Sequence, residues 1–149
     1  MPEKKTLRAA RKDKRQGKSA STQAGEFVRE EFHHVRSGKH GARSAKQAIA
    51  IGLSKARRAG VRLPAPKPGQ AAAETRRKSR KDLERGKHPR RKVSARRSRA
   101  TVNALKRERR DTVSHAALSS HARAAAQHHT RSERSASARK AARTRAAHR

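Results

Sequence analysis

Doublets and triplets of Lys and Arg recur along the whole chain, and their spacing points to phosphate chemistry. Each phosphate that such a cation neutralises releases condensed counterions, so binding strengthens with charge and weakens with salt. One cluster would be typical of a solvated surface, but a dozen clusters with few carboxylates to neutralise them favour nucleic acid. The predicted phosphate-binding residues are Lys46, Arg57, Arg58, Arg76, Arg77, Lys78, Arg80, Arg90, Arg91, Lys92, Arg96, Arg97, Arg99, Arg107, Arg109, Arg110, Arg139 and Lys140.

The missing aromatic residues narrow the mode of binding. The chain has no Trp, no Tyr and two Phe, so bases have almost no aromatic surface to stack on. Arg can pair with guanine, but an unfolded Arg-rich segment does not fix that geometry. We therefore expect contacts to the nucleic-acid backbone with little sequence preference.

Other chemistries find little support in the sequence. The absence of Cys excludes disulfides, thiolate zinc sites and a Cys nucleophile. No Walker loop, dinucleotide fingerprint, HExxH or nucleophile elbow is present, so we expect no enzyme, no cofactor and no small-molecule substrate. Glu30 and His33 have the spacing of half a di-iron pattern, with His34 and His40 nearby, but no second copy exists. Surface or phosphate-facing histidines are therefore favoured, and no metal site is predicted.

The elements that must position these residues are predicted to be helices. Residues 22–36 place Phe27, Val28, Phe32 and Val35 on one stripe of a helix that ends at Gly38. Residues 44–59 form a second amphipathic helix, and together they make a helical hairpin over about 22–60. Residues 3–16 can form a short basic helix before it.

The ends of the second helix carry recognisable signals. Ser44 and Gln47 fit a capping box, and Gly60 fits the left-handed position that ends a helix, with Val61 packing back on Ala56. Gly52 lies on the apolar stripe, where a missing side chain would allow the two helices to approach closely.

The apolar residues are too few for one compact domain. Of the 46 hydrophobic residues in this 149-residue chain of net charge +32, 29 are Ala, and nine of the 17 larger ones lie in residues 24–63. Ordering each residue costs about 1–2 kcal/mol of backbone entropy, which Ala hardly offsets. High charge with low hydrophobicity is typical of disorder.

We therefore predict an all-α chain with a small folded part. The segments are a basic N-terminal segment (1–21), the helical hairpin (22–63), a Pro-rich linker (64–69) and an Arg-, Ala- and Ser-rich basic tail (70–149). The tail is expected to be largely disordered or transiently helical, because Val102, Leu105, Val113 and Leu118 give only a thin apolar seam. The hairpin could also pair with a second copy to form a homodimer.

Two features of the hairpin allow alternatives. A helix-turn-helix would place its second helix on DNA, but the seven-residue connection is longer than the usual three or four residues. Glu31 projects into the apolar stripe of the first helix. We expect it to pair with Lys or Arg of the second helix, or of another copy, rather than to act in catalysis.

Three stretches resemble a family of small, basic, uncharacterised bacterial proteins that carry a domain of unknown function. They are AGEFVREE at 24–31, GKHG at 38–41 and KQAIAIGLSKARRAGV at 46–61. The resemblance implies a bacterial intracellular source and no established activity. The tail also resembles linker-histone tails in its Ala-rich basic composition, although it prefers Arg to Lys.

The expected function is that of a non-enzymatic, histone-like protein of the bacterial cytoplasm, associated with the nucleoid. It would bind nucleic acid, with DNA favoured over RNA, and compact or bridge DNA. An RNA- or ribosome-associated role is the alternative. Membrane association is disfavoured, because no apolar run approaches membrane-helix length and bulky apolar residues are scarce beside the charge.

Overall fold

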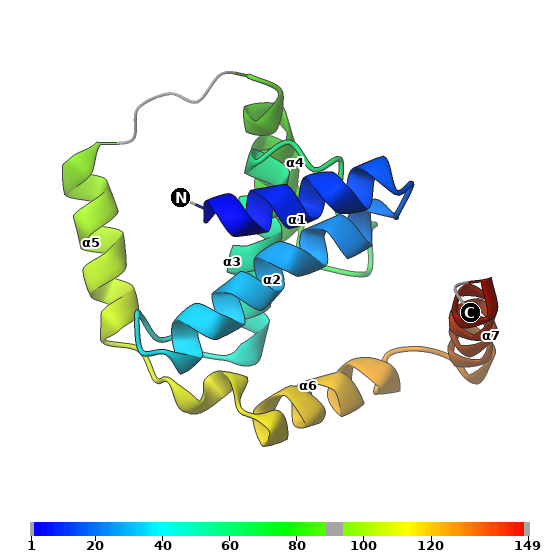
Figure 1. The fold of residues 1–149 in the computed structure, drawn as a ribbon. Coiled ribbons are helices and arrows are strands. Elements are labelled where there is room, and N and C mark those ends of the chain that lie inside the picture. Colours follow the sequence, from blue (N-terminus) through cyan, green and yellow to red (C-terminus); the bar gives the residue numbers. More distant parts are fainter. Residues whose placement is uncertain (1, 89–93, 148–149) are drawn as a thin grey trace. The chain divides into compact units, whose positions relative to one another are not determined.

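The computed structural model describes residues 2–88 and 94–147. Within these ranges the chain forms seven α-helices and one short 3-10 helix (Figure 1). They are α1 (Lys4–Arg15), α2 (Ala20–Arg36), α3 (Ala45–Arg58), α4 (Ala73–Lys87), α5 (Ala95–Lys106), η1 (Asp111–Val113), α6 (His115–Gln127) and α7 (Arg131–Ala147). The all-α class is confirmed. The chain divides into two units, Met1–Val113 and Ser114–Arg149.

The α2–α3 hairpin begins and ends at residues that its sequence explains. Ser44 Oγ accepts a hydrogen bond from the Gln47 N–H at 3.2 Å, while Gln47 reaches one residue beyond the predicted cap, to the N–H of Arg43. Gly60 has a φ of +92°, and the Val61 N–H donates to Ala56 O at 3.1 Å. The predicted end of the second helix is therefore confirmed. α2 begins earlier than expected, with Ser19 as its cap.

One core cluster joins α1, α2 and α3. Its buried members are Ala10, Ala24, Phe27, Ala56 and Val61. The helices can approach closely because Gly52 has no side chain, since a Cβ there would lie 2.7 Å from Val28 Cα. Figure 1 shows α1 alongside α2, where Ala10 brings a sequence-distant segment into this core.

Polar contacts complete the packing of α3. Lys55 Nζ lies 2.5 Å from Oε2 of the fully buried Glu31, so the predicted pairing between the two hairpin helices is confirmed. Ser54 Oγ donates to Asp82 Oδ2 at 2.5 Å and so ties α3 to α4. The close approach of α4 requires Gly86, where a Cβ would lie 2.2 Å from Arg57 O.

A second core cluster depends on a residue far along the sequence. Val113 is fully buried with Val35, Ala42 and Ala48, and its carbonyl accepts bonds of 3.2 and 3.0 Å from Arg36 Nε and Nη2. The expectation that Val113 belongs only to a thin seam of an unfolded tail is wrong. The folded unit extends 50 residues beyond the hairpin segment that was predicted to end at residue 63.

The prediction of a long, largely disordered C-terminal tail is also wrong, because α4 to α7 occupy most of residues 70–149. Residues 94–147 contain no Gly and no Pro, and Ala and Arg are among the strongest helix formers. Two caps that the prediction overlooked begin α6 and α7. Ser114 Oγ accepts from the Ala117 N–H at 3.3 Å, and Thr130 with Glu133 forms a reciprocal capping box.

The second unit consists of α6 and α7, and no residue of either helix is buried. Intrinsic propensity and caps therefore account for these helices, rather than a hydrophobic core. Across the described parts of both units, no helix has the length and apolar character needed to cross a membrane.

Candidate nucleic-acid interface

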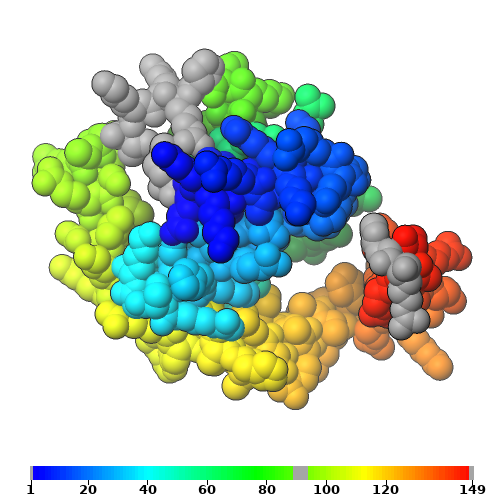
Figure 2. All heavy atoms as spheres, viewed as in Figure 1, coloured from blue at the N-terminus to red at the C-terminus, as the bar shows by residue number. Residues whose placement is uncertain are grey.

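α1 presents a regular basic surface. Its inner side buries Thr6, Ala10 and Asp13, as the periodicity of a helix requires for residues three or four apart. Lys4, Arg8, Arg11 and Arg15 repeat on the opposite side, and all four are exposed. We call these four residues the α1 row. Figure 2 shows α1, in dark blue, at the surface of the face in view.

The α1 row has no acidic partner in the part of the chain that the structure describes. No Asp or Glu oxygen of residues 2–88 or 94–147 lies within 4.0 Å of its side-chain nitrogens. The one carboxylate on α1, Asp13, is turned inward and pairs with Lys18 at 2.8 Å. The row therefore keeps its full positive charge toward solvent.

α4 carries a shorter row of the same kind. Arg77, Lys81 and Arg85 are four residues apart and exposed, and we call them the α4 row. The opposite side of α4 is fixed to α3 through Asp82 and through the backbone contact at Gly86. The α4 row thus projects from an anchored helix rather than from a flexible segment.

Most of the predicted phosphate-binding residues are exposed, but the structure does not gather them into one site. They lie on α3, α4 and α5, on the segment after α5 and on α7. The exposed ones are Lys46, Arg58, Arg77, Lys78, Arg80, Arg96, Arg97, Arg99, Arg107, Arg109, Arg110, Arg139 and Lys140. Arg76 is half-buried, and Arg90, Arg91 and Lys92 lie outside the described residues.

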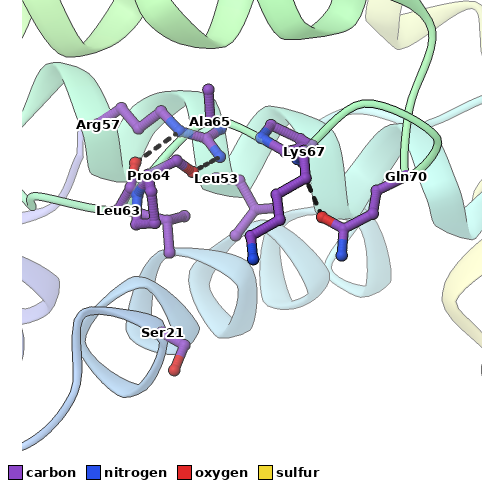
Figure 3. A pocket seen from close by; sticks show the side chains of 9 residues that line it. Ser21, Leu53, Arg57, Leu63, Pro64, Ala65, Lys67 and Gln70 are labelled. Carbon is purple, nitrogen blue, oxygen red and sulfur yellow. Dashed lines mark hydrogen bonds between the residues drawn. The ribbon is translucent and has the colours of Figure 1, made fainter. Parts of the chain in front are cut away.

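Arg57 differs from the rest because its side chain is buried. Its Nε and Nη2 donate to the carbonyl oxygens of Leu63 and Pro64, each at 3.2 Å. Figure 3 draws both hydrogen bonds as dashed lines. Burial lowers the pKa of Arg57 from its ordinary value, and the nearby Asp82 carboxylate opposes that shift. Arg57 therefore holds the segment after α3 in place, and we do not include it in the interface.

The same view shows an open hollow beside Arg57. It has a volume of about 440 Å³ and is lined by apolar side chains such as Leu53 and Leu63, with Ser21 and Gln70 at its edge (Figure 3). It offers no convergent set of charged groups, so it adds nothing to a phosphate-binding surface.

Several predicted cations already have partners on the protein. Arg109 is paired with Asp111, which raises the pKa of Arg109 and lowers that of Asp111 through their hydrogen bond. Lys78 lies 2.7 Å from Glu74, and Arg58 lies 3.5 Å from Asp82. Exposed pairs of this kind are weak and can be exchanged for a phosphate.

The backbone of the segment after α5 is fixed by the α2–α3 loop. The Gly41 N–H donates to Leu105 O and the Ala42 N–H to Arg109 O, both at 2.8 Å. Gly41 is needed for this approach, because a Cβ there would lie 1.9 Å from Glu108 O. The exposed side chains of Arg107, Arg109 and Arg110 are therefore held on an ordered backbone.

The list of predicted phosphate-binding residues left out the α1 row, Lys81 and Arg85. Lys4, Arg11, Arg15 and Lys81 belong to the basic clusters of the sequence but were not selected, and Arg8 and Arg85 belong to none, because the rows follow the spacing of four or three residues along a helix. On α1 that spacing was readable, because Thr6 and Ala10 mark the opposite face. On α4 it was not, since the buried side is defined by Ser79 and Asp82, which are polar.

Comparison with known proteins gives a partial answer about the family. Residues 11–67 match a sequence profile described as "Family of unknown function (DUF6496)". This range runs from within α1 through the hairpin to the Pro-rich segment, so the resemblance to an uncharacterised family holds for that part of the chain. No curated protein and no solved structure matches the chain.

Proposed function

We propose that this protein binds nucleic acid by phosphate contacts with little sequence preference, and that it compacts or bridges DNA. In this proposal it is not an enzyme and needs no cofactor or small-molecule substrate. It acts in the bacterial cytoplasm with the nucleoid, in keeping with the bacterial family that the motif at 46–61 resembles. A homodimer through the hairpin stays a prediction.

The observation that carries the proposal is the α1 row, a line of four cations with no acidic partner among the described residues, on a chain of net charge +32. From Lys4 to Arg15 the row extends about 17 Å, at 1.5 Å per residue. Duplex DNA presents one negative charge per roughly 1.7 Å of its axis, so each cation of the row has phosphates within reach.

The proposal is tested by titrating salt during binding to a random-sequence duplex. A triple variant in the α1 row (K4Q/R8Q/R11Q) should make the slope of log K against log salt shallower by about 2.7, at about 0.9 per lost phosphate contact. The control variant, R29Q/R43Q/K87Q, removes the same charge from cations outside the predicted set that Glu26, Glu108 and Glu84 already pair.

The control should change the slope less, since its cations are neutralised on the protein. A wild-type slope of only about one or two would contradict extensive phosphate contact. Equal effects of the two triple variants would contradict the assignment of the α1 row. Competition between duplex DNA and structured RNA decides between DNA and the alternative, an RNA- or ribosome-associated role.

A further inference from the structure

A cluster of histidine and carboxylate side chains is buried where α2 meets the α2–α3 loop. It consists of Glu30, Glu31 and His34 from α2 and His40 from the loop, and we call it the histidine–carboxylate cluster. Glu31 is 0% exposed, His34 is 5% exposed and the His40 side chain is 11% exposed. The expectation of surface histidines is therefore wrong for His34 and His40. Glu31, His34 and His40 each bring one ligand atom to within 4.8 Å of the others.

Hydrogen bonding fixes the tautomer of His40. Its Nδ1 lies 3.0 Å from the carbonyl oxygen of Gly41, which can only accept, so Nδ1 carries the proton. In the neutral ring Nε2 then keeps its lone pair, 3.1 Å from Glu31 Oε1. That oxygen is buried and has no hydrogen-bond partner among the described residues. Two acceptor atoms therefore face each other, and a cation between them would satisfy both.

A carboxylate fixes His34 in the complementary way. His34 Nε2 lies 2.7 Å from Glu3 Oε1, and this hydrogen bond lowers the pKa of Glu3 from its ordinary value. In the tautomer in which Nε2 donates to Glu3, Nδ1 keeps its lone pair, 4.0 Å from Glu30 Oε1. Lys39 Nζ, 3.2 Å from Nε2, neutralises Glu3 at 3.5 Å. In Figure 2 the N-terminal residues rest on the region of the α2–α3 loop.

The buried carboxylates of the cluster carry more negative charge than the one neighbouring ammonium neutralises. Lys55 Nζ is shared between Glu31 Oε2 at 2.5 Å and Glu30 Oε1 at 3.6 Å, so one ammonium faces two buried carboxylates. Uncompensated buried charge is costly. One proton on His40 would pair Nε2 with Glu31, but it would leave His34 Nδ1 unpaired. A metal ion would take up the lone pairs of Glu31, His34 and His40 together.

We propose that Glu31, His34 and His40 bind a divalent transition-metal ion, for which Zn²⁺ is the probe. Two imidazoles and a carboxylate are an established donor set for Zn²⁺, and Glu30 is the nearby fourth group. Bonds of about 2.0–2.1 Å in a tetrahedral site place ligand atoms roughly 3.3–3.4 Å apart, close to the 3.1 Å between Glu31 Oε1 and His40 Nε2. Glu3 and the Gly41 carbonyl orient the two rings, as outer partners do in metal sites.

The ion would fasten the α2–α3 loop to α2, since His40 belongs to the loop and the other ligands to the helix. Because the site is built only in the folded chain, binding is expected to stabilise that state. The site is independent of the phosphate-binding proposal, as it shares no residue with the α1 row or the α4 row.

The test uses the full chain, freed of metal with a chelator and titrated with Zn²⁺ against a chromophoric competitor. We expect one ion per chain, a thermal midpoint that rises with Zn²⁺, and with Co²⁺ the strong visible absorption of a four-coordinate site. H34Q and H40Q should each weaken binding at least tenfold. H33Q is the matched control, because His33 is the exposed neighbour of His34, and it should bind as the wild type does.

E3Q separates a metal site from a folding effect, because Glu3 lies at the rim and contacts no ion in the proposal. Loss of such an outer partner should weaken binding about 10- to 100-fold. Circular dichroism and melting in chelator establish that each variant folds. The proposal is overturned if no stoichiometric ion binds, if folded H40Q and E3Q bind Zn²⁺ as the wild type does, or if H33Q weakens binding as much as H40Q.

Discussion

At the scale of single residues, Gly52 sets the distance between α2 and α3. We expect G52A to destabilise the folded chain by about 1–3 kcal/mol, since its Cβ would lie 2.7 Å from the backbone of Val28 and the helices must separate. The free energy of unfolding from denaturant titration measures this effect.

The matched control is G25A, in the same hairpin. A Cβ at Gly25 would meet nothing within 4 Å, and Gly25 lies inside α2. Because Ala restricts the unfolded chain and favours helix, G25A should raise stability by about 0.4–1 kcal/mol. Similar changes of stability in the two variants would mean that helix propensity, rather than close approach, determines the effect at position 52.

The roles of residues that depend on neighbouring positions could be predicted from the sequence. The roles of residues that depend on contacts with distant segments could not. Gly60 and Val61 follow from how a helix ends, and Glu31 with Lys55 follows from two amphipathic stripes that face each other. His34 and His40 were taken as surface residues because nothing in residues 33–40 shows that Glu3 returns to His34 or that Glu31 faces His40. The contact between Glu3 and His34 joins positions 31 residues apart.

At the scale of elements, the short helix η1 contributes Val113 to the second core cluster. We expect V113A to destabilise the unit Met1–Val113 by about 1–3 kcal/mol, because the lost methyl groups leave a cavity against Val35 and Ala48. V102A is the control, since Val102 is 42% exposed on α5 and should change the unfolding free energy little. Equal stability of the two variants would refute the placement of Val113 in the core.

The capping box of α7 predicts a dependence on pH. The backbone N–H of Thr130, and then its hydroxyl, lower the pKa of Glu133 from its ordinary value. A carboxylate with a lowered pKa stabilises the folded form above its ordinary pKa, and this contribution disappears as the pH falls through the lowered value. The first turn of α7 should therefore fray in acid.

Backbone chemical shifts of residues 130–135 in the full chain measure that fraying. E133Q is the informative control, because Gln can still accept from the Thr130 N–H but does not titrate. Its first turn should respond less to acid than that of the wild type. Shifts that follow the same course in both proteins would exclude Glu133 as the titrating group.

The chain has more stable helices than predicted, because the prediction gave more weight to a buried apolar face than to helix propensity and capping. A buried apolar face was treated as a requirement, and this criterion correctly selected α2 and α3. α7 has no such face, yet it begins at a capping box and consists mainly of Ala, Arg and Ser. The polar contacts that fix α4, such as Asp82 with Ser54, join segments 28 residues apart and have no periodic pattern to reveal them.

At the scale of the whole molecule, the charge is divided between two units that differ in how they fold. Residues 1–113 hold 35 Lys and Arg against ten Asp and Glu, and residues 114–149 hold eight against one. The first unit has two apolar core clusters, whereas α6 and α7 bury no residue. In the proposed function, each basic unit would hold one of the two nucleic-acid segments that are bridged.

This division gives a prediction about the shortened chain 1–114, which keeps the peptide carbonyl of Val113 that Arg36 binds. It should still bind one duplex through the first unit, with a shallower salt dependence because up to eight phosphate contacts are lost. It should no longer hold two duplexes together, as measured by capture of a labelled duplex on an immobilised one.

A full-length variant with Arg139, Lys140, Arg143 and Arg145 changed to Gln keeps α7 but removes much of its charge, and it should bridge as poorly as the shortened chain. If residues 1–114 bridge as efficiently as the full chain, the second unit has no part in bridging, and the first unit must supply both contacts.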